Sequence, residues 1–275
     1  SSTDSVAGDD LYLSIDADLQ KATYLALQNE IAAIVYSNIK SGEIPINDVY
    51  TALIGNSVIN TEHFSKAKAS DTEKNVLSVF KSRQKTTLGK IKQELTSSPE
   101  ALNTMSDEVL DEFTYIISML KDDQVLLKNE IDTSDSVYQK WKNQKISPKE
   151  YLSYCITQHW IDISQLNVDE KYADSTEVYD ALCKYILKNI KTDTEFSKII
   201  YQYMITRGEI SPRQLCLILF DQGVLDYDDA TVNKLKNGSL SPRDFLMKKI
   251  YNIEITPAQL ALEPCTGSCV VTDEK

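Results

Sequence analysis

The sequence contains few helix-breaking residues and few histidines. Its 275 residues include 8 glycines, 7 prolines and 2 histidines. So few glycines and prolines exclude collagen-like and low-complexity chains. His63 and His159 stand in no H-E-x-x-H motif, and no G-x-S-x-G is present. The common metalloprotease and serine-hydrolase motifs are therefore absent from the sequence.

Long apolar runs and a basic surplus are also lacking. No apolar run approaches the ~18 residues of a membrane-spanning helix, and residues 1–10 read as a flexible polar arm without a signal-peptide core. The formal net charge is -12, with lysine and arginine scattered along the chain. Such a chain repels a phosphate backbone, so nucleic acid is not an expected partner. We expect the chain as given to be soluble. This expectation does not concern a leader or a membrane anchor elsewhere in a longer protein.

The cysteines do not form a metal motif. None of the five stands in a C-x-x-C pair, and the first three lie in apolar helical patterns, which predicts buried free thiols. Cys265 and Cys269 could bridge or bind metal, but neither histidine is near them in sequence. We expect no metal and no cofactor. The five are Cys155, Cys183, Cys216, Cys265 and Cys269.

Periodicity predicts a mainly α, multi-helix fold. Residues 11–15 alternate like a strand, after which Asp16 caps a helix that ends at Lys40-Ser41-Gly42. Further helices are predicted over 70–95, 106–120 and 176–190. Residues 268–272 are again β-prone, so we expect a short two-stranded antiparallel ribbon formed by the N- and C-terminal segments.

Four helix starts share one capping pattern, in which Ser or Thr precedes Pro and follows an aliphatic residue. The hydroxyl accepts from free backbone amides, and proline fixes the first helical residue. The copies are irregularly spaced, which does not support a solenoid. They begin at Ser147, Ser211, Ser241 and Thr256.

Two clusters of acidic residues and one histidine–tryptophan pair are expected to have structural roles. Two acidic groups are expected to be solvated or to favour a helix dipole. His159 and Trp160 are expected to pack together at a helix end. The acids are Asp221, Asp226, Asp228 and Asp229 in one group, and Asp107, Glu108, Asp111 and Glu112 in the other.

Both ends of the chain carry a family resemblance. Residues 11–22 read LYLSIDADLQKA and residues 264–273 read PCTGSCVVTD. They resemble two neighbouring pieces of the transpeptidase domain in class B penicillin-binding proteins, with Ser14 in place of the usual threonine. The helical stretch between them, with Asp221-Gln222-Gly223 and Ser241-Pro242, is similar to an insert of clostridial members.

The resemblance implies a division of the chain and a function. It implies a flexible arm over 1–10, the first strand and helix of the transpeptidase domain over 11–40, a helical insert domain over 41–262, and a returning strand over 263–275. The parent would be a membrane-anchored serine D,D-transpeptidase that crosslinks peptidoglycan on the outer face of the cell membrane and binds penicillin. The remainder of the transpeptidase domain would be a partner of this chain.

The catalytic motifs of that family have no usable counterpart here. Ser82-x-x-Lys85 and Ser65-x-x-Lys68 match the family's S-x-x-K in form, but Ser82 is predicted to face solvent. Lys40-Ser41-Gly42 reads as a helix end and not as the K-[ST]-G strand, and no S-x-N is present. We therefore assign no catalytic, cofactor-binding or metal-binding residue, and whether this chain acts in an enzyme depends on its parent.

Three functional hypotheses stay open. The first is a noncatalytic insert of a peptidoglycan transpeptidase. The second is a helical module that binds divisome proteins or peptidoglycan glycan, which fits 15 tyrosines against 6 phenylalanines. The third is a free-standing cytosolic helical protein, which free thiols favour on redox grounds.

Overall fold

The computed structural model describes residues 16–97, 100–168 and 173–262. Within these ranges the chain is mainly helical, as predicted, and its only β feature is an isolated antiparallel bridge between Leu126 and Ile161. The two segments of the expected ribbon, 11–15 and 268–272, lie outside the described residues. None of the helices described is both long and apolar enough to cross a membrane.

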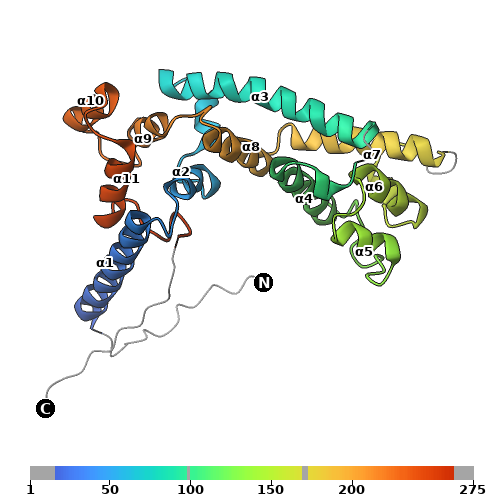
Figure 1. Cartoon of the computed structure of the whole chain (residues 1–275), viewed down its shortest axis with the longest axis horizontal. Helices are drawn as coiled ribbons and strands as arrows, with labels where there is room; N and C mark the ends of the chain where they lie inside the picture. The colour runs from blue at the N-terminus through green and yellow to red at the C-terminus, as the bar shows by residue number, and fades with distance from the viewer. Residues whose placement is uncertain (1–15, 98–99, 169–172, 263–275) are drawn as a thin grey trace, which may run out of the picture. The chain divides into compact units, whose positions relative to one another are not determined.

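The described helices follow one another with short connections (Figure 1). In chain order they are α1 (Ala17–Ser41), α2 (Ile46–Gly55), η1 (Thr61–Ser65), α3 (Asp71–Thr96), η2 (Leu102–Thr104), α4 (Asp107–Asp122), α5 (Ser136–Lys142), α6 (Pro148–Thr157), η3 (Ile163–Gln165), α7 (Ser175–Ile190), α8 (Thr194–Thr206), α9 (Pro212–Asp221), α10 (Asp229–Asn237) and α11 (Pro242–Tyr251), where η denotes a 3-10 helix.

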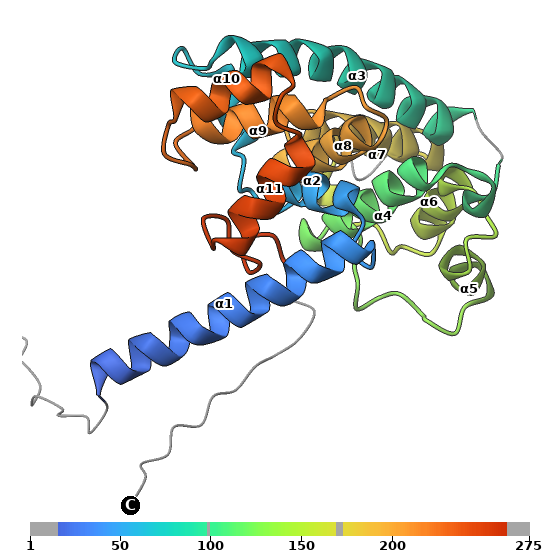
Figure 2. The same ribbon diagram turned by 60° about the vertical axis from the view of Figure 1, so that its left-hand side comes forward.

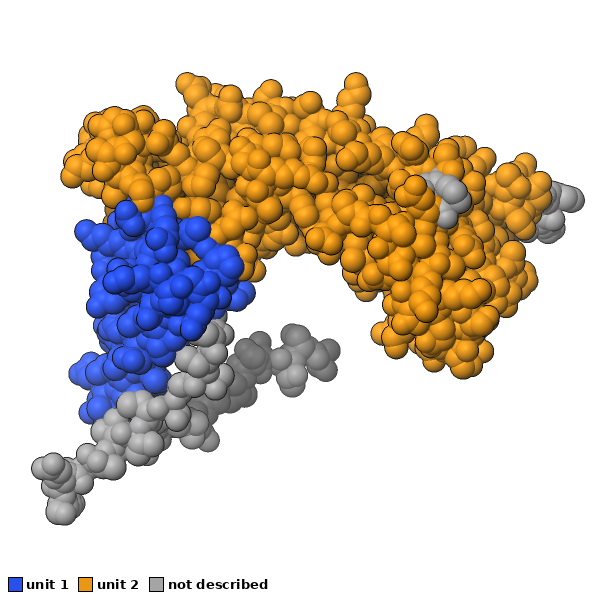
Figure 3. Space-filling view, in the orientation of Figure 1, with its two compact units in different colours: residues 1–46, 243–275 blue, residues 47–242 orange. Residues whose placement is uncertain are grey.

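The chain divides into two compact units, coloured separately in Figure 3. Unit 1 combines Ser1–Ile46 with Arg243–Lys275, and unit 2 is the continuous segment Asn47–Pro242. In unit 1 the rings of Tyr36 and Tyr251 meet edge to face at 5.2 Å, and the Arg243 guanidinium donates to the carbonyl of Ile39 at 3.1 Å. These contacts join α1 to α11, so the segment 41–262 expected as an insert extends into unit 1 at both ends.

The core of unit 2 forms around α3. This helix packs against η1, α6, α7, α8 and α9, and Figures 1 and 2 both show α7 and α8 lying beside it. At its centre the ring of Phe80 stacks on that of Tyr201 at 4.1 Å, and Phe64 meets the same tyrosine edge to face at 5.8 Å. Aromatic pairs in these geometries contribute beyond their buried area, so they tie η1, α3 and α8 together.

Most predicted helix starts are confirmed by their caps. Asp16 accepts from the amides of Asp18 and Leu19, and Ser70 forms a capping box with Glu73. Ser147 and Ser211 cap α6 and α9, each followed by proline, as the Ser-Pro pattern predicts. These short-range bonds depend only on local sequence, which is why the pattern identifies them.

One predicted helix start is wrong. Thr256 Oγ1 accepts from the amide of Gln259 at 3.1 Å, as a cap would, but residues 257–261 form a turn and not a helix. Ala261 already has a positive φ of 50°, which ends the helical path. The Thr-Pro copy of the pattern therefore closes a single turn.

Several helices in both units end in a recurrent turn that the Ser-Pro pattern does not reveal. A residue with positive φ follows the helix, and two residues later an aliphatic residue donates its amide to a carbonyl six residues back, as Ile210 does to Met204 at 3.3 Å and Leu225 to Leu219 at 3.1 Å. The positive-φ residues Gly208, Gly223, Gly238 and Ile253 lie 15 residues apart. This part of the chain therefore repeats a segment that consists of one short helix and one turn.

Candidate functional site

The serine and lysine residues that match catalytic motifs lie apart from any enclosed site. Ser82 is exposed, as predicted, and so are Lys85, Ser65 and Lys68. Gly42 ends α1 with a φ of 89°, and its amide bonds to the carbonyl of Asn38, so Lys40-Ser41-Gly42 is the helix end that was predicted. No arrangement for acyl transfer involves these residues.

The thiols and the acidic loop are also as predicted. Cys155, Cys183 and Cys216 are free and buried, and burial raises the pKa of Cys155 to about 12, which keeps the thiol protonated and unreactive. Cys265 and Cys269 lie outside the described residues. Across the parts of the chain that the structure describes, no group of three metal-binding side chains occurs. The loop acids are exposed, with Asp221 accepting from the Ser70 hydroxyl at 2.6 Å and Asp228 capping α10.

The prediction for His159 is wrong. The imidazole is exposed, while Trp160 is 5% exposed and its ring meets that of Tyr154 at 5.7 Å. His159 has a φ of 56° shortly after the end of α6. The two residues that follow it, Trp160 and Ile161, are each 5% exposed.

The second acidic group lies at the start of α4, as predicted, but two of its four members are buried and not solvated. Glu108 is 3% and Glu112 is 1% exposed. Residues four apart share one helix face, and this face packs against α7 and α8. Glu108 is paired with two arginines from distant parts of the chain, Arg207 at 2.6 Å and Arg83 at 3.3 Å. Only the packing of three helices reveals this pairing.

Glu112 has no such partner among the described residues. Its Oε1 makes no hydrogen bond, and burial, followed by the neighbouring charge of Glu108, raises its pKa to about 8. Lys90 and Arg83 oppose this shift, and Asp111 adds to it. The carboxyl is therefore protonated at neutral pH, since a charged form without a close partner is costly in the interior.

A second buried carboxyl, Glu73, stays ionised. Burial acts to raise its pKa, but hydrogen bonds from the Gln222 amide, the Ser70 backbone amide and His63 hold the pKa below its usual value. The three bonds each measure 2.7 Å. The Ser70 hydroxyl donates to Asp221, so no free nucleophile completes this Glu–His pair. The cluster joins η1, α3 and α9 and has a structural role.

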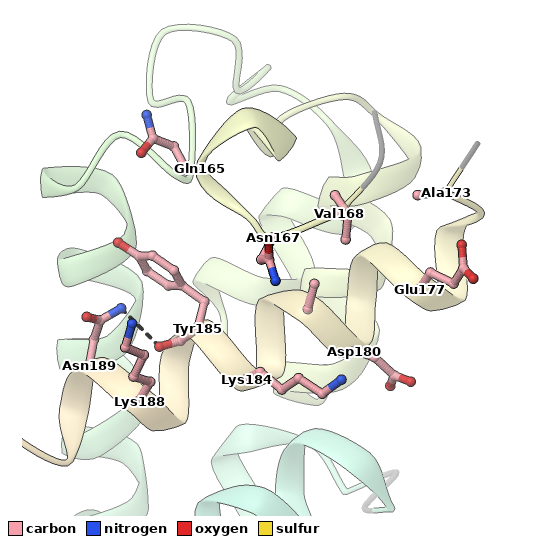
Figure 4. A pocket seen from close by; sticks show the side chains of 11 residues that line it. Gln165, Asn167, Val168, Ala173, Glu177, Asp180, Lys184, Tyr185, Lys188 and Asn189 are labelled. Atoms are coloured by element: carbon pink, nitrogen blue, oxygen red, sulfur yellow. Dashed lines mark hydrogen bonds between the residues drawn. The ribbon is translucent and has the colours of Figure 1, made fainter. Parts of the chain in front are cut away.

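An open groove runs along α7 (Figure 4). It encloses about 720 Å³, with Glu177 and Asp180 toward one end and Lys188 and Asn189 toward the other. The Asn189 amide donates to the carbonyl of Tyr185, and the Tyr185 hydroxyl donates to Asp123. Two carboxylates and two lysines line this exposed helix face, so the groove as a whole selects neither anions nor cations.

The first half of α1 carries exposed apolar side chains. The buried residues of this 25-residue helix are Ala32, Val35 and Ile39, all in its second half. In the first half Leu19, Tyr24 and Leu25 are 46%, 61% and 40% exposed. At 3.6 residues per turn these side chains point to different sides of the helix, so a partner that covered them would contact more than one side.

Comparisons of this chain with protein-family models, with curated proteins and with solved structures find no match.

Proposed function

We propose that this chain is a noncatalytic helical insert, with flanking pieces, of a class B penicillin-binding protein that crosslinks peptidoglycan. The observation that supports it best is the composition of unit 1, which joins both ends of the sequence, while unit 2 is continuous. A domain inserted into a host leaves the host pieces together and the insert unbroken. Residues 16–22, the described part of the segments with transpeptidase resemblance, fall in unit 1.

The exposed half of α1 fits the same proposal. Residues 16–22 of the family resemblance lie there, and Leu19, Tyr24 and Leu25 are left uncovered by the described chain. Full burial of one such side chain contributes about 1.5 to 3 kcal/mol. In the proposed parent protein the remainder of the transpeptidase domain covers this surface.

The finer features of the proposal follow from the family. Residues 11–15 and 268–272 pair as an antiparallel ribbon, and the parent is membrane-anchored with this domain on the outer face. The catalytic serine lies in the remainder of the parent. This chain supplies no reacting group.

A fluorescent penicillin tests the proposal. We expect it to label the full-length protein covalently and to leave the isolated chain 1–275 unlabelled, because acylation needs the parent's serine. Preincubation with unlabelled penicillin should abolish the signal. Absence of labelling in the full-length protein, or a parent sequence without S-x-x-K, S-x-N and K-[ST]-G in that order, would refute the assignment.

A second candidate is a helical interaction module that binds divisome proteins or glycan. A groove between α4 and α5, lined by half-buried aromatic side chains, favours it. The two candidates are compatible, because an insert can also bind. Pulldown against cell-division proteins and binding to purified glycan test this candidate, and two negative results would leave a spacer role.

A further inference from the structure

The groove between α4 and α5 combines aromatic and polar side chains. It encloses about 350 Å³, within the range of small-ligand sites. Tyr138 and Trp141, three residues apart on α5, form its aromatic side. Ser118, Lys121, Lys142 and Gln144 are its polar lining, and the whole set lies in unit 2.

The aromatic side is held rigidly. The Trp141 indole stacks on the ring of Tyr151 at 4.5 Å with 5° between the planes, and Tyr151 is fully buried. Asp135 caps α5 by accepting from the amides of Val137 and Tyr138. Its other oxygen accepts from the Tyr154 hydroxyl at 2.8 Å. A ring fixed before binding loses little conformational entropy when a ligand covers it.

The polar side chains of the groove are free to bind a ligand. Ser118, Gln144, Lys121 and Lys142 make no side-chain hydrogen bond or ion pair with any described residue. The backbone of Gln144 is nevertheless held in place, since its carbonyl accepts from the amide of Asn103 at 2.9 Å. A hydroxyl, an amide and two ammonium groups are therefore available beside the aromatic rings.

The charge of the groove is opposite to that of the chain. The protein has 41 acidic residues against 29 lysines and arginines, yet the charged residues that line this groove are both lysines. The groove along α7 has two carboxylates beside its two lysines. The α4–α5 groove therefore favours a ligand with negative charge.

We propose that the α4–α5 groove binds a sugar unit that carries a carboxylate. The apolar face of the ring lies against Trp141 and Tyr138, its hydroxyl or acetamido groups pair with Ser118 and Gln144, and its carboxylate pairs with Lys121 and Lys142. Aromatic rings beside hydroxyl and amide groups match the alternating faces and edges of a saccharide. The proposal gives the interaction-module candidate a site, and it holds independently of the transpeptidase assignment.

A nucleic acid would also use aromatic stacking and lysines. Two lysines on a chain with a net charge of -12 attract a polyphosphate backbone only weakly. The same two positive charges are enough to pair with a single carboxylate. The observations therefore favour the acidic sugar.

Binding is measured on the whole chain by tryptophan fluorescence and calorimetry. The acidic probe is the disaccharide of N-acetylglucosamine and N-acetylmuramic acid, the neutral one is diacetylchitobiose, and the nucleic-acid probe is an oligothymidylate. The only tryptophans are Trp141 and the buried Trp160, so a change in emission reports on the groove. We expect saturable binding of the acidic disaccharide, with the neutral one about tenfold weaker because it lacks the charge-assisted bonds.

Two lysines of α5 provide a matched pair of variants. Lys142→Gln should weaken the acidic disaccharide about tenfold and leave the neutral one unchanged, whereas Lys140→Gln, exposed on the same helix outside the groove, should change neither. Trp141→Phe should weaken both sugars, with folding checked by circular dichroism. Equal effects of the two lysine variants, tighter binding of the oligothymidylate, or no saturation by the acidic disaccharide at millimolar concentration would overturn the proposal.

Discussion

The buried carboxyl of Glu112 should make the stability of unit 2 fall as pH rises. Burial and the charge of Glu108 raise its pKa to about 8 in the folded chain, against an ordinary value of 4.5. The folded state therefore binds more protons than the unfolded state between these two values. The contribution of Glu112 to stability is greatest below about pH 4.5, and it declines as pH rises toward about 8. Each pKa unit corresponds to about 1.4 kcal/mol, so the loss at pH 7 is about 3 kcal/mol.

Replacement of Glu112 by glutamine should remove this loss. The amide keeps the shape of the protonated carboxyl but cannot ionise, so Glu112→Gln should unfold with a free energy about 3 kcal/mol higher than the natural chain at pH 7. The two proteins should converge near pH 4.5. Urea unfolding followed by circular dichroism at half-unit steps from pH 4.5 to 8.5 measures the difference.

An exposed glutamate provides the control. Glu130 lies in a turn of the same unit with its side chain exposed, so Glu130→Gln should leave the pH dependence unchanged. The reasoning would fail if the difference between Glu112→Gln and the natural chain were the same at pH 5 and pH 8. It would fail equally if both glutamate variants changed the slope alike.

Two further predictions concern the other buried carboxyl and the helix ends. Glu73→Gln keeps an oxygen for the Ser70 amide, but it places an amide nitrogen opposite the Gln222 amide and removes charge-assisted bonds, which should lower the free energy of unfolding by about 2 to 3 kcal/mol at pH 7. Because the folded pKa of Glu73 is lowered, this loss should shrink as pH falls below its ordinary value of 4.5, the opposite trend to Glu112. Gly42→Ala should cost about 1 kcal/mol, since Gly42 has a φ of 89°, whereas Gly89→Ala in the middle of α3 should stabilise by up to about 1 kcal/mol. Urea unfolding measures each variant, and equal effects of the two glycine substitutions would contradict the assigned backbone conformations.

Local chemistry could be predicted from the sequence and long-range pairing could not. The caps at Ser70, Ser147 and Ser211 depend on atoms within three residues, and the exposure of Ser82 follows from helical periodicity. Glu108 looks like an ordinary acid of a first helical turn until α3 and α8 bring two arginines to it. Its burial depends on how helices pack, which periodicity does not specify.

The recurrent turn shows the same limit at the backbone level. Glycine marks the positive-φ position at Gly208 and Gly238, but Ser57 and Ile253 occupy it without any local signature. A search for glycine therefore finds only part of the repeat. The hydrogen bonds that stabilise the turn come from the backbone and leave this side chain almost free to vary.

The 15-residue spacing of Gly208, Gly223, Gly238 and Ile253 has a consequence for how the domain can change in length. Each helix and turn forms its closing bonds within its own segment, so duplication or deletion of one whole segment would preserve every cap and every turn. Changes of other lengths would misplace a buried aliphatic residue. Homologous chains should therefore differ here by multiples of one segment, which gives evolution a simple way to lengthen or shorten the domain without redesigning its core.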